Sequence, residues 1–327
     1  MVFLGIDVGG SKTHALLSDE NGQVLGFGVG PGGNPEMVGY DGLTLAMQAA
    51  LQKACKSSGV KRMQIAAAGF GIAGYDWPFQ YTDTLQAVQA LGLRTEILAI
   101  ENDAVTPIYG GTTHGWGIAA CVGTGNNVRG VDAQGRTGRI TGNSSTFGEF
   151  GGAGEIMQTV LQRLAWMWTG RGKATALAEI LVRDCCASDL GDLIEGLVAE
   201  RYHLKADQAP LVVAAAEEGD VVAGEVLTWH AHELVMSVLA VARQLDLTEQ
   251  PFEVVMSGKL YQVSNLYCQT FQESVQHEAR LAECKLFTSP PVVGAVIMAM
   301  QAAQAAGVGV TKARAALLGI DFKNNTY

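Results

Sequence analysis

The stretch Asp7-Val8-Gly9-Gly10-Ser11-Lys12-Thr13 is the most informative part of this sequence. An apolar run, Val2–Val8, ends in an acid and two glycines, and a second strand, Thr13–Ser18, follows at once. Glycines let the backbone turn tightly, and successive N–H groups in such a turn form a nest for an anion. The stretch therefore predicts a phosphate loop at Gly9, Gly10, Ser11 and Lys12, with Asp7 beside it to hold a hydrated Mg²⁺. The alternative is an ordinary hairpin with a capping Asp.

The next hundred residues predict one α/β unit. Asn21-Gly22 is a hairpin turn, and Pro31–Pro35 is a loop in which glycine and proline exclude a helix. The pattern of apolar residues then predicts strands and helices in the order β-β-β-α-β-α-β-α. The later elements of this unit are the strand Gln23–Val29, the helix Leu43–Lys56, the strand Gln64–Phe70, the helix Phe79–Leu91, the strand Glu96–Ile100 and a helix that begins near Asp103.

A second copy of the opening hairpin begins near Trp116. Val8-Gly9-Gly10 corresponds to Val122-Gly123-Thr124, and the turns at Gly22 and Gly135 lie at nearly the same spacing. This self-similarity predicts a duplicated domain, although chance agreement in a glycine-rich chain is the alternative. The expected strands of the copy are Gly117–Val122, Val128–Asp132 and Arg136–Thr141.

The rest of the chain is predicted to be mostly helical. We expect an N-terminal lobe over residues 1–105 and a C-terminal lobe with a helical insertion over 106–295, with C-terminal helices at about 296–320 packing back on the first lobe. The predicted elements are helices Glu155–Trp168, Ala174–Cys185, Asp189–Glu200, Pro210–Glu217, Val221–Leu245, Asn265–His277 and Val292–Ala306, and strands Phe252–Met256 and Cys284–Phe287.

Three further groups of residues are candidates for chemistry. Gly123, Thr124 and Gly125 form a second glycine turn that can supply N–H groups to an anion. Asp103 follows a buried strand, where it is either an N-cap or a carboxylate that deprotonates a hydroxyl during phosphoryl transfer. Ser257-Gly258, after another strand, would let a nucleoside lie flat against the backbone.

Charge and composition exclude several classes of protein. Lys+Arg 22 against Asp+Glu 32 gives a net charge of −10, with no basic run, so we expect neither nucleic acid nor an anionic membrane as a partner. No stretch is long and apolar enough to span a membrane, and the first residues do not predict a signal peptide. The six cysteines contain no C-x-x-C pair, so we expect reduced thiols and a cytoplasmic protein, with a homodimer left open. No P-loop motif or four-ligand metal site is present.

Taken together, these motifs resemble the actin/hexokinase/Hsp70-like ATPase superfamily. Within it the sequence is most similar to the BadF/BadG/BcrA/BcrD ATPases, which include N-acetylglucosamine and glucosamine kinases. The resemblance rests on Asp7–Thr13, Asn102-Asp103-Ala104, Gly123-Thr124-Gly125, Ser257-Gly258 and Pro291-Val292-Val293-Gly294-Ala295, in that order.

The resemblance implies a two-lobed ribonuclease-H-like fold that holds ATP, Mg²⁺ and a sugar. By position it makes Asp7 the Mg²⁺ residue and Asp103 the catalytic base, and it places Asn34 and Asn127 on the sugar side. Gly9–Lys12 and Gly123–Gly125 would be the two phosphate loops, and Ser257 and Gly258 would belong to the adenosine segment.

One stretch departs from the amino-sugar kinases. Where they carry Gly-Trp-Gly and then Gly-Asp-Glu-Gly-Ser, this chain has Gly142-Asn143-Ser144 and then Gly148-Glu149-Phe150-Gly151-Gly152. The longer Glu149 replaces the Asp that binds the sugar. Cys121 has no second cysteine nearby, so the iron–sulfur cluster of the activator branch is not expected. The sequence thus predicts an ATP-dependent amino-sugar kinase, the alternative being a regulatory ATPase of the same family without a small acceptor.

Overall fold

The first sheet of this computed structural model has five strands in the order β3-β2-β1-β4-β5. They are β1 (Val2–Val8), β2 (Lys12–Asp19), β3 (Val24–Pro31), β4 (Ile65–Ile72) and β5 (Leu98–Glu101). The pairs β1–β4 and β4–β5 are parallel, whereas β1–β2 and β2–β3 are antiparallel. The carboxyl ends of β1, β4 and β5 therefore meet at one edge of the sheet, which is where α/β proteins place their ligands.

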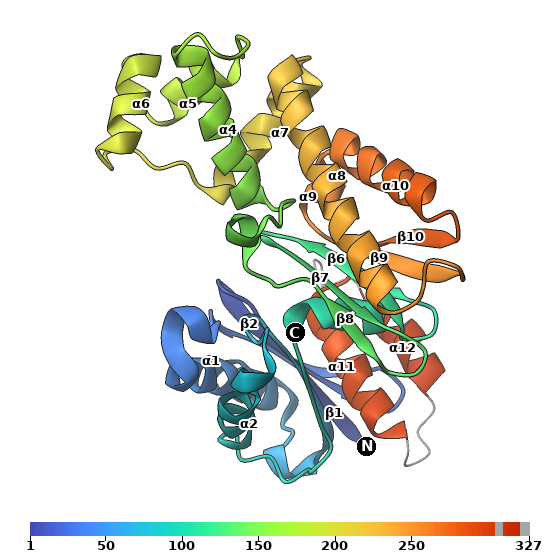
Figure 1. The fold of residues 1–327 in the computed structure, drawn as a ribbon. Helices are drawn as coiled ribbons and strands as arrows, with labels where there is room; N and C mark the ends of the chain where they lie inside the picture. Colours follow the sequence, from blue (N-terminus) through green and yellow to red (C-terminus); the bar gives the residue numbers. More distant parts are fainter. Residues whose placement is uncertain (305–309, 321–327) are drawn as a thin grey trace. The chain divides into compact units, whose positions relative to one another are not determined.

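Helices cover both faces of this sheet (Figure 1). The apolar side chains of α1 (Pro35–Ser58) and α2 (Tyr81–Gln89) share a core with Leu4, Ile6 and Val8 of β1. On the opposite face, α11 (Pro291–Ala302) and α12 (Val310–Leu318) pack with Phe3 and Leu16. Gly69 makes the close approach of α11 possible, because a Cβ there would lie 2.1 Å from the Ala295 carbonyl oxygen.

Helix α1 begins earlier than the sequence predicted. The Asn34 side chain accepts a hydrogen bond from the Glu36 N–H at 2.9 Å, and Pro35 stands at the first helical position, where its missing N–H costs nothing. The first turn is separated from the rest by a kink at Gly39, whose φ is +70°. The expectation of no helix through Pro35 was therefore wrong at its last residue.

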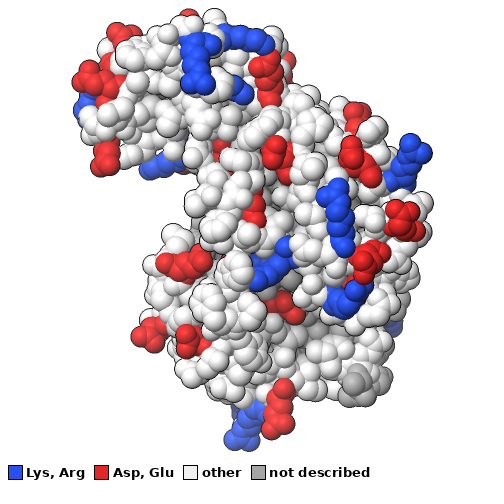
Figure 2. Space-filling view, viewed as in Figure 1, with Lys and Arg blue, Asp and Glu red and all other residues white. Residues whose placement is uncertain are grey.

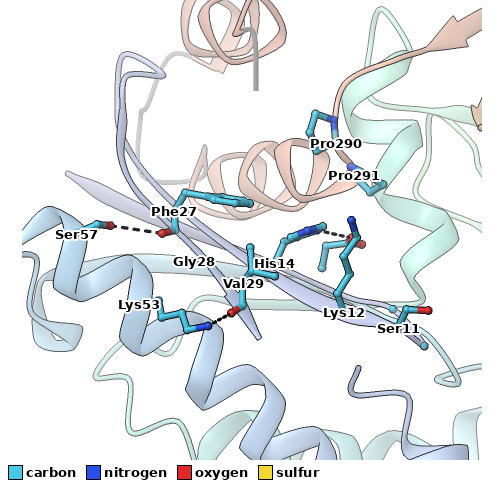
Figure 3. A pocket seen from close by; sticks show the side chains of 13 residues that line it. Ser11, Lys12, His14, Phe27, Gly28, Val29, Lys53, Ser57, Pro290 and Pro291 are labelled. Atoms are coloured by element: carbon cyan, nitrogen blue, oxygen red, sulfur yellow. Dashed lines mark hydrogen bonds and ion pairs between the residues drawn. The ribbon is translucent and has the colours of Figure 1, made fainter. Parts of the chain in front are cut away.

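The exposed edge of β3 is covered by side chains of α1. The Lys53 ammonium group donates to the Val29 carbonyl oxygen at 2.7 Å, and the Ser57 hydroxyl donates to the Phe27 carbonyl oxygen at 3.5 Å (Figure 3). The other edge strand, β5, is only 4 residues long.

The second sheet repeats the order of the first. Its strands are β6 (Gly117–Val122), β7 (Asn126–Val131), β8 (Thr137–Arg139), β9 (Phe252–Gly258) and β10 (Ala282–Phe287), and their order is β10-β9-β6-β7-β8. From β8 to β10 this is the order of β3-β2-β1-β4-β5. The prediction of a duplicated α/β fold is confirmed.

Two short helices each come soon after a strand, and six longer helices follow β8 in addition to α11 and α12. α3 (Thr106–Gly111) follows β5, and α9 (Leu260–Val263) follows β9. The others are α4 (Ala153–Trp168), α5 (Leu177–Asp184), α6 (Leu190–Val198), α7 (Ala209–Glu217), α8 (Val221–Gln244) and α10 (Asn265–Glu278).

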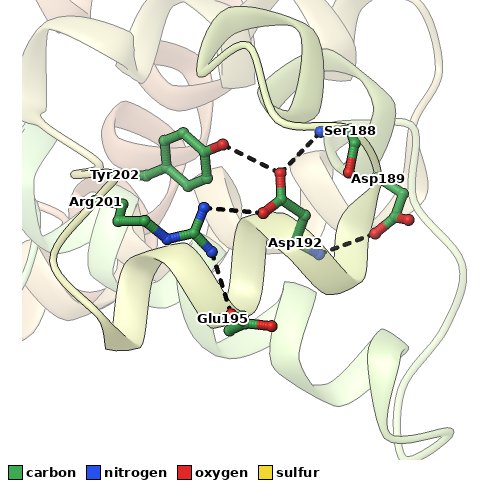
Figure 4. Close-up of polar contacts among 6 residues, drawn as sticks. All are labelled: Ser188, Asp189, Asp192, Glu195, Arg201 and Tyr202. Carbon is green, nitrogen blue, oxygen red and sulfur yellow. Dashed lines mark hydrogen bonds and ion pairs between the residues drawn. The ribbon is translucent and has the colours of Figure 1, made fainter.

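A polar network fixes α6 within the helical insertion (Figure 4). The Asp192 carboxylate accepts hydrogen bonds from the Ser188 N–H at 2.9 Å, the Tyr202 hydroxyl at 3.1 Å and the Arg201 guanidinium at 3.1 Å. The Ser188 N–H and Arg201 hold the pKa of Asp192 below its usual value. The network thus ties the start of α6 to the loop that leaves it.

The structure describes residues 1–304 and 310–320, which divide into two compact units. One unit comprises Met1–Ala119, Gly130–Arg136 and the described part of Phe287–Tyr327; the other comprises Ala120–Arg129 and Thr137–Leu286. The last residues of the predicted helix Val292–Ala306 lie outside the described part.

No helix among the described residues is long and apolar enough to cross a membrane. All six cysteines are described, and none forms a disulfide. On the face seen in Figure 2, Lys and Arg are interspersed with Asp and Glu.

Candidate active site

The first glycine loop forms the turn that its sequence predicts. The Gly9 N–H donates to the Lys12 carbonyl oxygen at 3.0 Å, and the Gly33 N–H donates to the Gly9 carbonyl oxygen at 3.1 Å. A Cβ at Gly32 would lie 2.1 Å from the Gly10 carbonyl oxygen, so the two glycine stretches are in backbone contact. The N–H groups of Gly10 and Ser11 have no hydrogen-bond partner within the described part of the chain. They are available to an anion.

This loop opens into a pocket of about 1020 Å³ on the same unit (Figure 3). A ligand of nucleotide size fits such a volume. The titratable side chains of the lining are those of Asp7, Lys12, His14 and Lys53. The other lining residues are Gly9, Gly10, Ser11, Phe27, Gly28, Val29, Ser57, Pro290 and Pro291.

His14 is a further candidate for the site that was not predicted from the sequence. Its Nδ1 lies 3.9 Å from the Asp7 Oδ2, and its ring stacks on Phe27 with the ring centroids 5.5 Å apart. The hairpin register pairs Asp7 with His14 directly. Counting back from the turn would therefore have placed the imidazole beside the carboxylate.

Asp103 lies at the carboxyl end of β5, and it is not the helix cap. The Asn102 side chain takes that role, because its Oδ1 accepts the Ala104 N–H at 3.0 Å. Gly71 pairs with Asp7 across the sheet, and a Cβ at Gly71 would lie 3.2 Å from the Asp103 Cα. The two acids thus flank a residue that has no side chain.

Asn34 lies near the same edge of the sheet. Its Oδ1 caps α1, and a Cβ at Gly74 would lie 2.3 Å from that oxygen. The amide nitrogen of Asn102 contacts the turn after Gly74, with 3.2 Å to both the Tyr75 carbonyl oxygen and Asp76 Oδ1. The first unit therefore gathers Asp7, the Gly9–Lys12 loop, Asn34 and Asp103 at one edge.

In the second unit, the start of α4 supports the second glycine loop. The N–H groups of Ala153 and Gly154 donate to the carbonyl oxygens of Gly123 and Thr124 at 3.0 and 2.7 Å. These are helix-start donors that would otherwise lack partners. With its carbonyl groups held by the helix, the loop leaves the N–H groups of Thr124 and Gly125 without a partner among the described residues.

Gly258 lies directly beside this loop. Its φ is +135°, and a Cβ would lie 1.9 Å from the Val122 carbonyl oxygen, so only glycine fits. Ser257 precedes it and is buried. The predicted adenosine segment and the second loop therefore come together within one unit.

Asn127 and Glu149 have different surroundings. Asn127 is half-buried on β7, next to Asn126, which is 8% exposed and whose amide atoms have no protein partner in the described chain. In the sequence Asn126 belongs to the second glycine loop, but no role was predicted for it. The Glu149 carboxylate accepts from the N–H groups of residues 141, 142 and 143 at 2.6, 2.9 and 3.1 Å. Those three bonds close the loop that precedes it.

The residues beside the first glycine loop fit a Mg²⁺ ion whose other ligands are water and the phosphate groups of a bound nucleotide. Asp7 offers hard oxygen donors and its side chain is 14% exposed. No group of three or more His, Cys, Asp or Glu that could hold a metal occurs among the described residues. Mg²⁺ is usually held by one or two carboxylates together with phosphates and water, so a single acid beside a phosphate loop is a sufficient protein contribution.

Two sheets of the same strand order, each with a glycine turn after its first strand, define the fold of actin-like ATPases and sugar kinases. Residues 4–299 match the BadF/BadG/BcrA/BcrD ATPase family, and this chain belongs to it.

Similar proteins support the same fold over nearly the whole length. An N-acetyl-D-glucosamine kinase from Dictyostelium discoideum is 24% identical over 91% of this chain and 98% of its own. An N-acetylmuramic acid/N-acetylglucosamine kinase from Clostridium acetobutylicum is 24% identical over 90% of this chain and 97% of its own. The crystal structure of a candidate N-acetylglucosamine kinase from Chromobacterium violaceum has a TM-score of 0.68 at 21% identity and covers 91% of this chain and 98% of its own.

Proposed function

We propose that this protein is a kinase that transfers the γ-phosphoryl group of ATP to a hydroxyl group of an amino sugar, with N-acetylglucosamine as the first candidate. The observation that carries the proposal is the position of Asp103. Its neighbour Asn102 caps the helix, and Asp103 lies next to Gly71, the residue that pairs with Asp7 across the sheet. A carboxylate at the end of a parallel strand can accept the proton of a hydroxyl while phosphate is held nearby.

Each candidate site residue of the first unit then has a role in this reaction. The N–H groups of Gly10 and Ser11, with the Lys12 ammonium group, bind phosphate oxygens. Asp7 orients the hydrated Mg²⁺, which supplies charge neutralisation when it is bound. Asp103 orients the acceptor hydroxyl and takes its proton.

In the second unit, Thr124 and Gly125 bind phosphate through their N–H groups. Gly258 gives a flat backbone surface for the nucleoside. Asn127 offers its amide group to the sugar, as Asn34 does in the first unit. We assign Glu149 an indirect part at the sugar, because its two oxygens already accept three backbone N–H groups.

The acceptor class rests on the relatives. Those named above are kinases of N-acetylglucosamine and, in one case, also of N-acetylmuramic acid. Both sugars carry an acetamido group on a pyranose, and Asn34 and Asn127 offer amide hydrogen-bonding groups of the kind that such a substituent pairs with.

The test is Mg·ATP-dependent ADP release with N-acetylglucosamine, glucosamine, N-acetylmuramic acid and glucose, with mass spectrometry of the product. We expect sugar-dependent turnover with at least one amino sugar. Asp103→Asn should lower kcat by roughly 10²–10⁴-fold and leave the melting temperature and ATP affinity unchanged. The exposed Asp83→Asn is the matched control.

Two outcomes would count against the proposal. Equal ATP hydrolysis with and without every sugar would favour a regulatory ATPase of the family. Sugar phosphorylation that is unaffected by Asp103→Asn would keep the kinase and remove the assigned base.

A further inference from the structure

Glu155 is a buried carboxylate in the first turn of α4, below the second glycine loop. It is 4% exposed, and its Oε1 accepts a hydrogen bond from the Ser144 hydroxyl. Its Oε2 is buried without a protein partner in the described chain. A buried acceptor without a partner costs stability, so packing alone does not explain this residue.

The carboxylate lies directly against the loop. A Cβ at Gly152 would lie 2.5 Å from Glu155 Oε2 and 2.3 Å from the Gly125 carbonyl carbon. A Cβ at Gly125 would lie 3.5 Å from Glu155 Oε1. Only the backbone of Gly152 therefore lies between the Glu155 carboxylate and Gly125. A displacement of the carboxylate should consequently displace Gly125.

Ser144 links the same carboxylate to the segment 141–152, where this chain departs from the amino-sugar kinases. Ser144 has a φ of +57°, a left-handed conformation that a serine adopts at a cost. Its backbone lies in the loop closed by Glu149, since its carbonyl oxygen accepts the Glu149 N–H at 3.1 Å. A strained residue therefore presents its hydroxyl to the Glu155 carboxylate, which lies against the second phosphate loop.

The C-terminal end of the segment 141–152 is fixed by a hydrogen bond from Tyr267. The Tyr267 hydroxyl donates to the Gly151 carbonyl oxygen at 2.8 Å. Burial, with the charge of nearby Glu155, raises the pKa of Tyr267 well above its usual value, so this donor keeps its proton. The segment 141–152 is anchored at one end by Tyr267, and at Ser144 it meets Glu155.

We propose that Glu155 is a positioning residue that couples the segment 141–152 to the second phosphate loop through Ser144. This inference rests on the proposed kinase function. The N–H groups of Thr124 and Gly125 must be positioned toward the transferred group with a precision of a fraction of an ångström, because misplacement by about 1 Å can cost about 10²-fold in rate. Glu155 sets that placement without touching sugar or nucleotide.

The test compares Ser144→Ala, Ser144→Gly, Glu155→Ala and Glu155→Gln in the full chain with the amino sugar that gives the highest turnover. Losing the link should lower kcat about tenfold to a hundredfold, with the KM for ATP changed by less than about threefold. Ala and Gly at position 144 should give the same loss, although only glycine relieves the backbone. Glu155→Gln keeps an acceptor oxygen for Ser144 and should restore kcat to within about threefold of wild type.

The double variant Ser144→Ala/Glu155→Ala separates coupling from two independent effects. We expect its kcat to equal that of the single variant with the lower kcat, because both substitutions break the same Ser144–Glu155 hydrogen bond. Ser145→Ala and Glu179→Ala are matched controls: a neighbouring serine and an exposed first-turn helix glutamate, both expected at wild-type kcat. Melting temperatures of all variants are measured alongside, and if Glu155→Ala does not fold, the two Ser144 variants with Glu155→Gln carry the test.

The results also distinguish this inference from the proposed function. Wild-type protein without sugar-dependent ADP release would overturn both. Sugar-dependent activity in wild type, together with a lowered melting temperature but wild-type kcat in the Ser144 variants, would make the link merely structural and overturn this inference alone. A product of the two single effects in the double variant would do the same.

Discussion

His230 should make the stability of the second unit depend on pH in a way that one substitution removes. The ring is fully buried on α8. Its Nε2 lies 2.9 Å from the Thr159 hydroxyl, and its Nδ1 has no protein partner among the described residues. The rings of Phe150 and Trp229 pack against it in T-shaped arrangements, with ring centroids 5.9 and 4.9 Å away. Burial lowers its pKa from 6.5 to about 3.

The sign follows from which state binds the proton. Above pH 6.5 the ring is neutral in both the folded and the unfolded chain, so it contributes no pH dependence. Between pH 6.5 and about pH 3, His230 is protonated in the unfolded chain but stays neutral in the folded chain. The free energy of unfolding therefore falls as the pH falls. At pH 4.5, two units below the unfolded pKa, the loss is about 2.7 kcal/mol.

The assay is urea unfolding at pH 7.5, 6.5, 5.5 and 4.5 for wild type and His230→Gln. Glutamine keeps a hydrogen-bonding group for Thr159 but does not titrate. The variant is expected to be less stable at pH 7.5, and to lose about 2.7 kcal/mol less than wild type on going to pH 4.5. His277→Gln, whose side chain is 83% exposed, is the control and should keep the wild-type slope. Parallel curves for wild type and His230→Gln would refute the reasoning.

Three further substitutions test the fold and the site. Gly294→Ala places a Cβ 2.0 Å from the Thr106 carbonyl oxygen, so calorimetry should show a loss of about 3 kcal/mol or more, whereas Gly224→Ala, with its nearest contact at 3.9 Å, should be neutral or stabilising; equal melting temperatures would contradict this. The Asp220 carboxylate caps α8 by accepting the Ala223 N–H at 2.8 Å through Oδ1, and its Oδ2 accepts the Ala176 N–H at 2.6 Å; Asp220→Ala should therefore cost about 1–2 kcal/mol in urea unfolding, Asp220→Asn should keep the cap but lose the Ala176 bond, and an unchanged midpoint for Asp220→Ala would argue against the cap. Asn34→Asp keeps the oxygen that caps α1 but loses the amide N–H, so steady-state kinetics should show a raised KM for the sugar at unchanged stability; an unchanged KM would remove Asn34 from the sugar site.

The regular part of the fold could be predicted because its signals are local. The strand Val2–Val8 and the turn after it depend on an apolar run and two glycines that are adjacent in the sequence, and β1 has those same bounds. The start of α1 could not be predicted, since Pro35 both ends a loop and begins a helix, and only the Asn34 bond to the Glu36 N–H decides between them.

The candidate site shows the same limit. Asn102 and Asp103 are both good caps, and the extended backbone of Asn102, with φ −62° and ψ 147°, selects it. The partners of Glu149 depend on the path of a loop that has no periodic pattern. Its three backbone bonds, like the Ser144–Glu155 contact, follow from tertiary structure that no spacing in the sequence encodes.

The covered edge of β3 has a consequence for how copies of this chain can associate. A strand from a second copy would have to displace the Lys53 ammonium group and the Ser57 hydroxyl from the carbonyl groups they occupy, and it would leave the lysine charge without its acceptor. Open sheet edges are where chains add to one another in ordered aggregates, and a lysine at the edge is one of the ways proteins prevent it. The opposite edge offers only the 4 residues of β5. The first sheet should therefore resist growing by the addition of strands, and the homodimer that the sequence leaves open should not form through its edges.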